Sequence, residues 1–269
     1  MQSTELALRP SYWASVSGGK DSLFMLNLIL HNLDKYPLDG VVHFELEIDY
    51  PFIKNVIDYM QSECERHGIR FYRIKPEKTW SELYQRYLFP MRTARWCNSK
   101  YKLSAKKRLE DFLRGKGFYL VCYIGYCADE EKRFAKRVDL QKLERYPLVE
   151  ENIEENTILQ WAKTQPIFNH YYETQKRCGC MFCPMADKMS QAYLYKYYPD
   201  KFNEMIRLMR ETEKIRSEQY RKPFSVISSN SKYNADYLER IIKSKYLPKL
   251  EELENVNKNG LQRIAEQGQ

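Results

Sequence analysis

The first half of the chain alternates short apolar runs with amphipathic stretches. This alternation is typical of βαβ units, in which a helix crosses over between two parallel strands. The apolar runs predict strands at residues 12–17, 40–48, 69–74 and 118–126. Helices are expected to begin near Asp21, Pro51, Trp80 and Ser104. We therefore predict an α/β domain built on an open, mainly parallel sheet.

The sequence changes character after residue 150. Thr157 is suited to cap a short helix, a group of cysteines follows, and the chain from Ala186 onward is mostly helical in pattern and highly charged. We therefore expect two parts, an α/β domain over residues 1–150 and a second part over residues 151–269. The second part would hold the cysteine cluster and a helical C-terminal domain.

Composition narrows the class of protein. The 269 residues include 44 Lys+Arg and 36 Asp+Glu, a formal net charge of +8, which favours a polyanionic partner but is also common in ordinary basic proteins. No apolar run approaches the roughly 18 residues that a membrane helix needs. A cytoplasmic protein without a membrane is expected. Seven cysteines in such a chain indicate metal binding, catalysis or chance rather than a disulfide framework.

The segment SGGKDS, residues 17–22, lies at the first strand-to-helix junction. Exposed N–H groups and the positive end of the helix dipole make such a junction an anion site. Gly18 and Gly19 allow the backbone to approach a phosphate closely. The hydroxyls of Ser17 and Ser22 can donate to phosphate oxygens. The segment is therefore a candidate phosphate-binding loop, with a chance turn of this composition as the alternative.

Lys20 would supply a compact positive charge in this loop, and Asp21 is suited to cap the helix or to hold a divalent cation. The glycine spacing fits neither a Walker A loop nor a dinucleotide-binding loop. It resembles the SGGxDS loop of the PP-loop ATP pyrophosphatases. That resemblance implies an adenine nucleotide alpha hydrolase-like fold, binding of ATP with Mg²⁺, and attack of a substrate oxygen on the α phosphate. The products would be an adenylated substrate and pyrophosphate.

Two further segments resemble the branch of phosphoadenylyl-sulfate (PAPS) and adenylyl-sulfate (APS) reductases. RWCNSKYK, residues 95–102, is similar to its Cys-Cys-x-x-x-Lys element, with asparagine in place of the second cysteine. IGYCADEEKR, residues 124–133, is similar to its strand-end segment. An aspartate after the second strand matches only in part. The resemblance implies nucleotide contacts from Asp49, Lys102, Gly125, Asp129, Glu130 and Arg133. Ordinary solvated charge is the alternative for the charged members of this set.

Cys178, Cys180 and Cys183 form a C-x-C-x-x-C pattern, and thiolates at this spacing can bind one metal or cluster. Iron-sulfur APS reductases pair such a group with an upstream cysteine. By that resemblance Cys97, Cys180 and Cys183 match ligands of a 4Fe-4S cluster, and we infer that Cys178 replaces the cysteine missing at Asn98. A structural Zn²⁺ on the same four thiolates and a set of unmetallated thiols remain the alternatives.

No cysteine follows Cys183, although sulfonucleotide reductases carry a nucleophilic cysteine near the C-terminus. Reductase chemistry is therefore not expected here. The chain resembles PP-loop proteins with iron-sulfur clusters that install sulfur on nucleic acids, namely tRNA thiolases and the sulfur-transfer component of DNA phosphorothioation. That resemblance implies adenylation followed by sulfur transfer, with Lys20, Asp21 and Cys97 as catalytic residues.

The partners expected from this function are a nucleotide, a nucleic acid (tRNA or DNA), and a cysteine desulfurase or another thiol donor, with a homo-oligomer left open. Two other functions stay open. One is a PAPS or APS reductase that uses an external thiol, and the other is a nucleotide-binding regulatory protein that has lost turnover.

Overall fold

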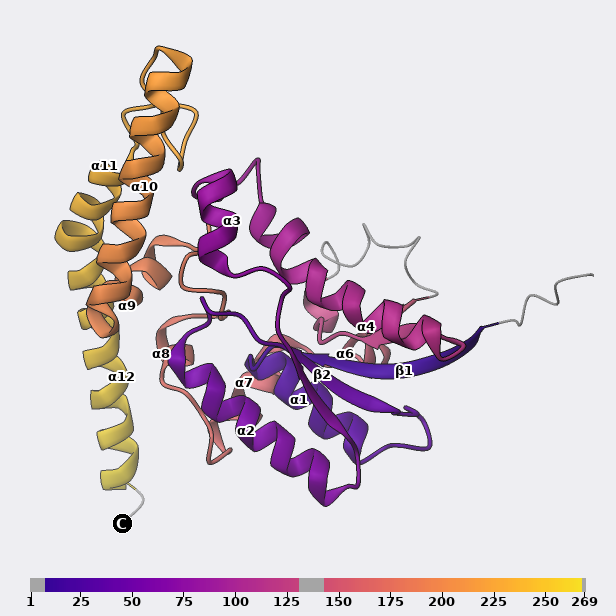
Figure 1. Cartoon of the computed structure of the whole chain (residues 1–269). Helices are drawn as coiled ribbons and strands as arrows, with labels where there is room; N and C mark the ends of the chain where they lie inside the picture. The colour runs from indigo at the N-terminus through magenta and orange to yellow at the C-terminus, as the bar shows by residue number, and fades with distance from the viewer. Residues whose placement is uncertain (1–7, 131–142, 268–269) are drawn as a thin grey trace, which may run out of the picture. The chain divides into compact units, whose positions relative to one another are not determined.

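The computed structural model describes residues 8–130 and 143–267, with side chains up to residue 257 (Figure 1). The described residues form two compact units. One comprises Met1–Glu77 and Tyr101–Phe168, and the other comprises Lys78–Lys100 and Asn169–Gln269. The second unit thus combines a segment from the first half of the chain with its C-terminal part. These units are each made of two segments and do not correspond to a single boundary. The boundary predicted at residue 150 stays a prediction.

The first unit is built on a five-stranded sheet in the order β3-β2-β1-β4-β5, in which every neighbouring pair is parallel. The strands are β1 (Arg9–Val16), β2 (Gly40–Phe44), β3 (Phe71–Ile74), β4 (Phe118–Tyr123) and β5 (Glu144–Arg145). The chain order reverses beside β1, because β2 and β3 lie on one side of it and β4 and β5 on the other. The predicted open parallel α/β fold is confirmed.

The helices of this unit pack on the sheet or on α1 through their buried apolar residues. The helices are α1 (Lys20–Leu30), α2 (Pro51–Arg66), α4 (Leu103–Gly115), α6 (Pro147–Glu150) and α7 (Glu155–Lys163). Leu109 and Leu113 of α4 are buried one turn apart and pack with Trp13 of β1 and Leu120 of β4. On α1, the Phe24 ring packs edge-on against Trp161 of α7, with centroids 4.9 Å apart. The core therefore lies between the sheet and these helices.

The second unit is helical. Its elements are α3 (Trp80–Tyr87), α8 (Tyr171–Thr174), α9 (Lys188–Tyr197), α10 (Pro199–Tyr220), α11 (Ala235–Ile241), the π-helical turn Ile242–Tyr246 and α12 (Leu247–Gln267), with a second π-helical turn, Cys97–Lys102, at the unit boundary. Two hydrogen bonds connect the segment Lys78–Lys100 to α10. The Tyr84 hydroxyl donates to the Leu208 carbonyl at 3.2 Å, and the Phe89 N–H donates to the Thr212 hydroxyl at 3.0 Å.

The predicted helix starts lie within one residue of the observed ones at all four positions. The cap predicted at Thr157 is wrong, because α7 begins at Glu155 and Thr157 lies inside it. Among the helices that the structure describes, none combines the length and the apolar character needed to cross a membrane.

Candidate functional site

The SGGKDS segment connects β1 to α1 beside the point where the strand order reverses. In open α/β sheets, ligands bind outside the carboxyl ends of strands at such a point. Gly18 has a φ of +75°, and a Cβ there would lie 2.8 Å from Ile53 of α2. Gly19 is the N-cap of α1 in extended conformation, and no side chain caps the helix. The loop is therefore both shaped by glycine and open to an anion at the amino end of α1.

The two serines hold this loop in place. The Ser17 N–H donates to the Ser22 hydroxyl at 3.2 Å, and the Gly19 N–H donates to the Ser17 hydroxyl at 3.4 Å. The Ser22 hydroxyl in turn donates to the Gly19 carbonyl at 2.9 Å. Ser17 is exposed, whereas Ser22 is buried. The exposed Ser17 is thus the serine whose hydroxyl has access to a ligand.

Lys20 is buried, and its Nζ lies 2.6 Å from Asp21 and 3.0 Å from Glu155 of α7. Burial opposes the charged form of the amine, but the attraction of Asp21 and Glu155 outweighs it and raises the pKa of Lys20. Burial also raises the pKa of Asp21; Lys20 opposes this shift, while Glu130 and Glu155 add to it. Lys20 therefore links α1 to α7 through two carboxylates.

Glu155 was not among the predicted site residues. It lies 135 positions from Lys20, and nothing in the local sequence marks it as the partner of that lysine. Only the packing of α7 on α1 brings the two side chains together.

The segment after β4 lies against the same loop. A Cβ at Gly125 would lie 3.0 Å from the Asp21 carbonyl oxygen and 3.2 Å from the Ser22 nitrogen, so glycine permits this close approach. Asp129 accepts the Glu155 N–H at 3.2 Å and so caps the first turn of α7, two residues before Thr157.

Glu130 is buried and accepts the Cys127 N–H at 3.3 Å. Burial raises the pKa of the Cys127 thiol, and the negative charges of Asp21 and Glu130 add to the shift. The contacts of Gly125, Asp129 and Glu130 in the structure are all with other protein groups, and nucleotide binding by these residues stays a prediction.

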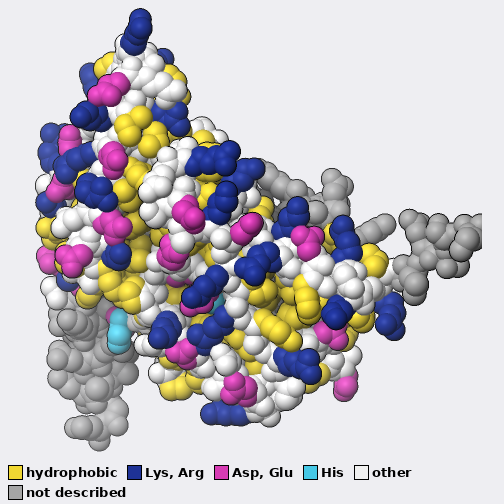
Figure 2. All heavy atoms as spheres, viewed as in Figure 1, with side chains coloured by type: hydrophobic (Ala, Val, Ile, Leu, Met, Phe, Trp, Pro, Cys, Tyr) yellow, Lys and Arg dark blue, Asp and Glu magenta, His cyan; other side chains and the backbone are white. Residues whose placement is uncertain are grey.

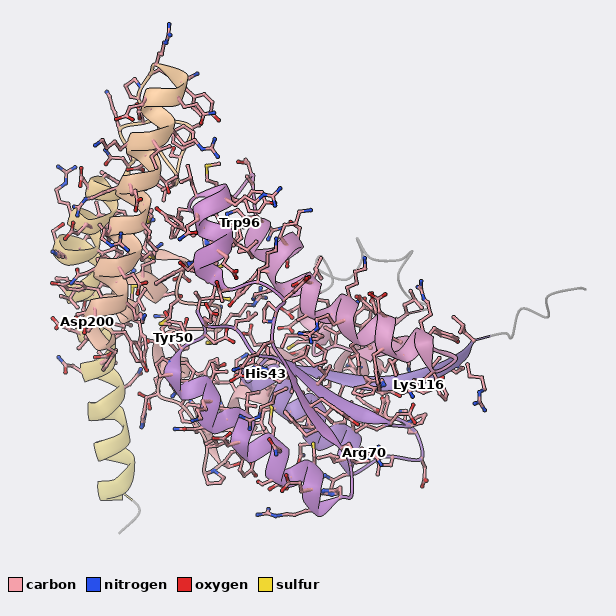
Figure 3. The ribbon with its side chains drawn as sticks, viewed as in Figure 1. His43, Tyr50, Arg70, Trp96, Lys116 and Asp200 are labelled. Atoms are coloured by element: carbon pink, nitrogen blue, oxygen red, sulfur yellow. The ribbon has the colours of Figure 1, made fainter. Side chains whose placement is uncertain are left out.

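His43 lies near the carboxyl end of β2 (Figure 3), where the charge of Lys102 acts on its ring. The His43 ring bonds the Val16 carbonyl at 3.0 Å, which makes Nδ1 the protonated nitrogen. Burial lowers the pKa of His43 although the Val16 bond opposes this shift, and the charge of Lys102 contributes to it. Asp49 lies in the turn before α2, where its N–H donates to the Leu46 carbonyl at 3.2 Å. Arg133 lies outside the described residues.

The four predicted cysteine ligands all belong to the second unit. Trp80 contacts both cysteine segments, since its ring lies 4.6 Å from that of Trp96 and 5.9 Å from that of Phe182, between centroids. The Cys183 N–H donates to the Cys180 carbonyl at 3.1 Å in a tight turn. Within residues 8–130 and 143–267, however, no group of three or more His, Cys, Asp or Glu is arranged to hold a metal ion. Metal binding by these cysteines stays a prediction.

Cys183 lines a small cavity of about 30 Å³ in this unit together with two basic residues, Arg92 and Lys188. The Arg92 guanidinium donates to the Pro184 carbonyl at 3.3 Å, and the Lys188 amine donates to Gln191 at 3.2 Å. Burial and the charge of Arg92 lower the pKa of Lys188. The surroundings of Cys183 are therefore electropositive.

Comparison with known proteins supports the fold. A family model of the phosphoadenosine phosphosulfate reductase domain matches residues 11–186, a range that includes the loop and the cysteine group. An uncharacterized protein of Methanocaldococcus jannaschii is 25% identical over 211 residues, which cover 73% of this chain. The chain spans 47% of that curated relative, about half its length.

Among solved structures, the U34-tRNA thiolase NcsA from Methanococcus maripaludis, determined with its 4Fe-4S cluster, is similar with a TM-score of 0.43. Its sequence is 15% identical, and the match covers 90% of this chain and 76% of that one.

Proposed function

Because the chain belongs to the phosphoadenosine phosphosulfate reductase domain family, we propose that it binds ATP and adenylates a substrate with release of pyrophosphate. The observation that supports this most is the open amino end of α1, with Gly18 and Gly19 before it, at the reversal of strand order. The acceptor we propose is a nucleic acid (tRNA or DNA), to which sulfur is then transferred.

In this proposal the backbone N–H groups of the loop and the Ser17 hydroxyl bind the β and γ phosphates. The main role of Lys20 would be to hold the Asp21 carboxylate by an ion pair, because its Nζ already lies between Asp21 and Glu155. Mg²⁺ would arrive with the phosphates of ATP, offset part of their charge, and find its protein ligand in Asp21. Lys102, Asp49 and Gly125 are proposed to contact the rest of the nucleotide.

The sulfur-transfer part of the proposal rests on the cysteines. Cys97, Cys178, Cys180 and Cys183 are proposed as ligands of a 4Fe-4S cluster, with Zn²⁺ as the alternative, and Cys97 also as a reactive thiol. Two observations support this assignment. Thiolates are suitable ligands for such a metal centre, and both cysteine segments contact Trp80. Because the thiols are not gathered for a metal, we derive no reaction step through a cluster. A cysteine desulfurase or another thiol donor would supply the sulfur.

The decisive experiment measures ATP binding and ATP–pyrophosphate exchange separately, with candidate RNA and DNA acceptors. We expect exchange in the wild type and a loss of at least about tenfold in Ser17→Ala, because an exposed phosphate donor is removed. Ser62→Ala is the control, since that hydroxyl donates to the Tyr59 carbonyl within α2, away from the loop.

Each other outcome points to a different function. ATP binding without exchange on any acceptor would contradict adenylation and favour a nucleotide-binding regulatory protein. Release of sulfite from PAPS or APS in the presence of an external thiol would instead favour a reductase.

A further inference from the structure

The sheet is covered unequally on its two faces. The helices α1 and α2 lie on one face, and α4 lies on the other beside β1 and β4 (Figure 1). The crossover from β3 to β4 begins with residues 78–100, which belong to the second unit, so that α4 is the helix that this crossover contributes to the first unit. The α4 face of β2 and β3 is therefore not covered by a second helix in the described part of this unit.

A groove of about 500 Å³ lies between α4 and β3 on this face. Its apolar lining includes Trp13, Tyr72, Ile74 and Phe112. Phe112 is 59% exposed and Tyr72 is 37% exposed, whereas Trp13 is buried beneath them. The Trp13 and Tyr72 rings lie 5.1 Å apart between centroids, so the floor of the groove is a packed aromatic surface. Figure 2 shows hydrophobic side chains in the region of these strands and α4, with Lys and Arg side chains and some Asp and Glu side chains around them.

The charged lining of the groove is basic. It consists of Arg73, Lys75 and Arg108, and no carboxylate is among the described residues that line the groove. Arg73 is turned away toward Asp58 of α2. The Lys75 side chain is 76% exposed, with Glu45 as a distant partner at 3.9 Å.

Arg108 is fixed beside the groove. Its guanidinium donates to the Lys75 carbonyl at 2.9 Å, and its side chain is exposed. Two further exposed cations, Arg70 before β3 and Lys116 after α4, lie at the amino-terminal edge of the same sheet (Figure 3). Positive charge is therefore found in the lining of the groove and at the amino-terminal edge of the sheet.

We propose that this groove binds a single-stranded nucleic acid, with bases stacked on Phe112 and Tyr72 and phosphates bound by Lys75 and Arg108. Exposed aromatic faces flanked by cations are the two elements of single-strand recognition. A purely apolar partner would bring no negative charge to the exposed Lys75 and Arg108 side chains, and a duplex would not present its base faces. The inference deepens the proposed function, since it names the surface that would hold the nucleic-acid acceptor.

The test measures fluorescence anisotropy of labelled single-stranded RNA and DNA of about 12 nucleotides, at several salt concentrations and without ATP. Phe112→Ala and Tyr72→Ala should each weaken binding about tenfold, because each removes a stacking surface. The double variant Lys75→Glu/Arg108→Glu should weaken it further and reduce the slope of log affinity against log salt by about 0.7 for each phosphate that the variant no longer neutralises.

Two controls match these changes outside the groove. Tyr220→Ala removes an aromatic ring that is 47% exposed on α10, and Lys54→Glu reverses an exposed charge on α2, on the opposite face of the sheet. Both should bind the oligonucleotides like the wild type. Thermal unfolding of all variants verifies that they are folded, and the exposure of Phe112 makes its removal tolerable.

Several results would overturn the inference. These are no saturable binding at low salt, equal affinity for duplex and single strand, equal effects of the groove variants and their controls, or a concentration-dependent dimer that Phe112→Ala abolishes. Oligonucleotide binding and ATP–pyrophosphate exchange are separate readouts. Exchange without groove-dependent binding refutes only the groove, and groove-dependent binding without exchange refutes only the proposed adenylation.

Discussion

There is little room for a side chain at Gly125, because the backbone of Asp21 and Ser22 lies directly against this residue. Gly125→Ala should destabilise the protein by about 1–3 kcal/mol and weaken ATP binding, since the added methyl group would displace the first turn of α1. Urea unfolding and nucleotide titration measure the two effects. Gly115→Ala is the control, because a Cβ there meets nothing within 4 Å. Equal free energies of unfolding for both variants would contradict this prediction, because they would show that the loop accommodates the added methyl group.

His43 makes stability depend on pH. Its pKa in the folded protein lies below the ordinary value of 6.5, mainly because of burial. The unfolded chain therefore binds a proton more readily, so the stability supplied by neutral His43 is present above about pH 6.5 and is lost as the pH falls. His43→Gln should flatten the fall in unfolding free energy between about pH 7.5 and about pH 5.5. Urea unfolding of the wild type and of this variant at several pH values measures the two slopes.

At the scale of single elements, α7 shows how a cap can come from a distant residue. Asp129→Ala should cost about 0.5–2 kcal/mol, because the Glu155 N–H loses its acceptor at the start of the helix. Thr157→Ala should have little effect, since Thr157 lies within the helix. Urea unfolding compares the two. A larger loss in the Thr157 variant would contradict the observed cap and restore the one expected from sequence.

Local signals predicted most elements well. Pro51 begins α2, and α3 begins after a capping box in which Thr79 and Glu82 bond each other's backbone N–H groups. The edge strand β5 was missed because it has only two residues, Glu144 and Arg145, and no apolar pattern. It is a strand only through its pairing with β4. Periodicity thus identifies elements that carry their own signal, while pairing alone creates the shortest ones.

At the scale of the whole molecule, metal content tests whether the cysteines act together. Anaerobically purified protein should be brown, with broad absorption near roughly 400 nm, if a thiolate-ligated iron-sulfur cluster forms. Cys97→Ala and Cys180→Ala should each lower the iron content. Cys64→Ala is the control, because burial raises the pKa of Cys64 to about 12 and keeps its thiol protonated.

Two outcomes would contradict parts of this prediction. A colourless protein with bound zinc would refute the iron-sulfur cluster and favour the Zn²⁺ alternative. Iron retained in Cys97→Ala but lost in Cys180→Ala would exclude Cys97 as the fourth ligand.

Spacing along the chain was enough to predict the parallel sheet, the place of the SGGKDS segment and the starts of four helices. Tertiary packing was needed to show that Glu155 pairs with Lys20, that Asp129 caps α7, and that residues 78–100 join the C-terminal helices. It also decided that an aromatic surface beside β3 stays exposed. Contacts between residues far apart in sequence depend on how the elements pack, and no local pattern encodes them.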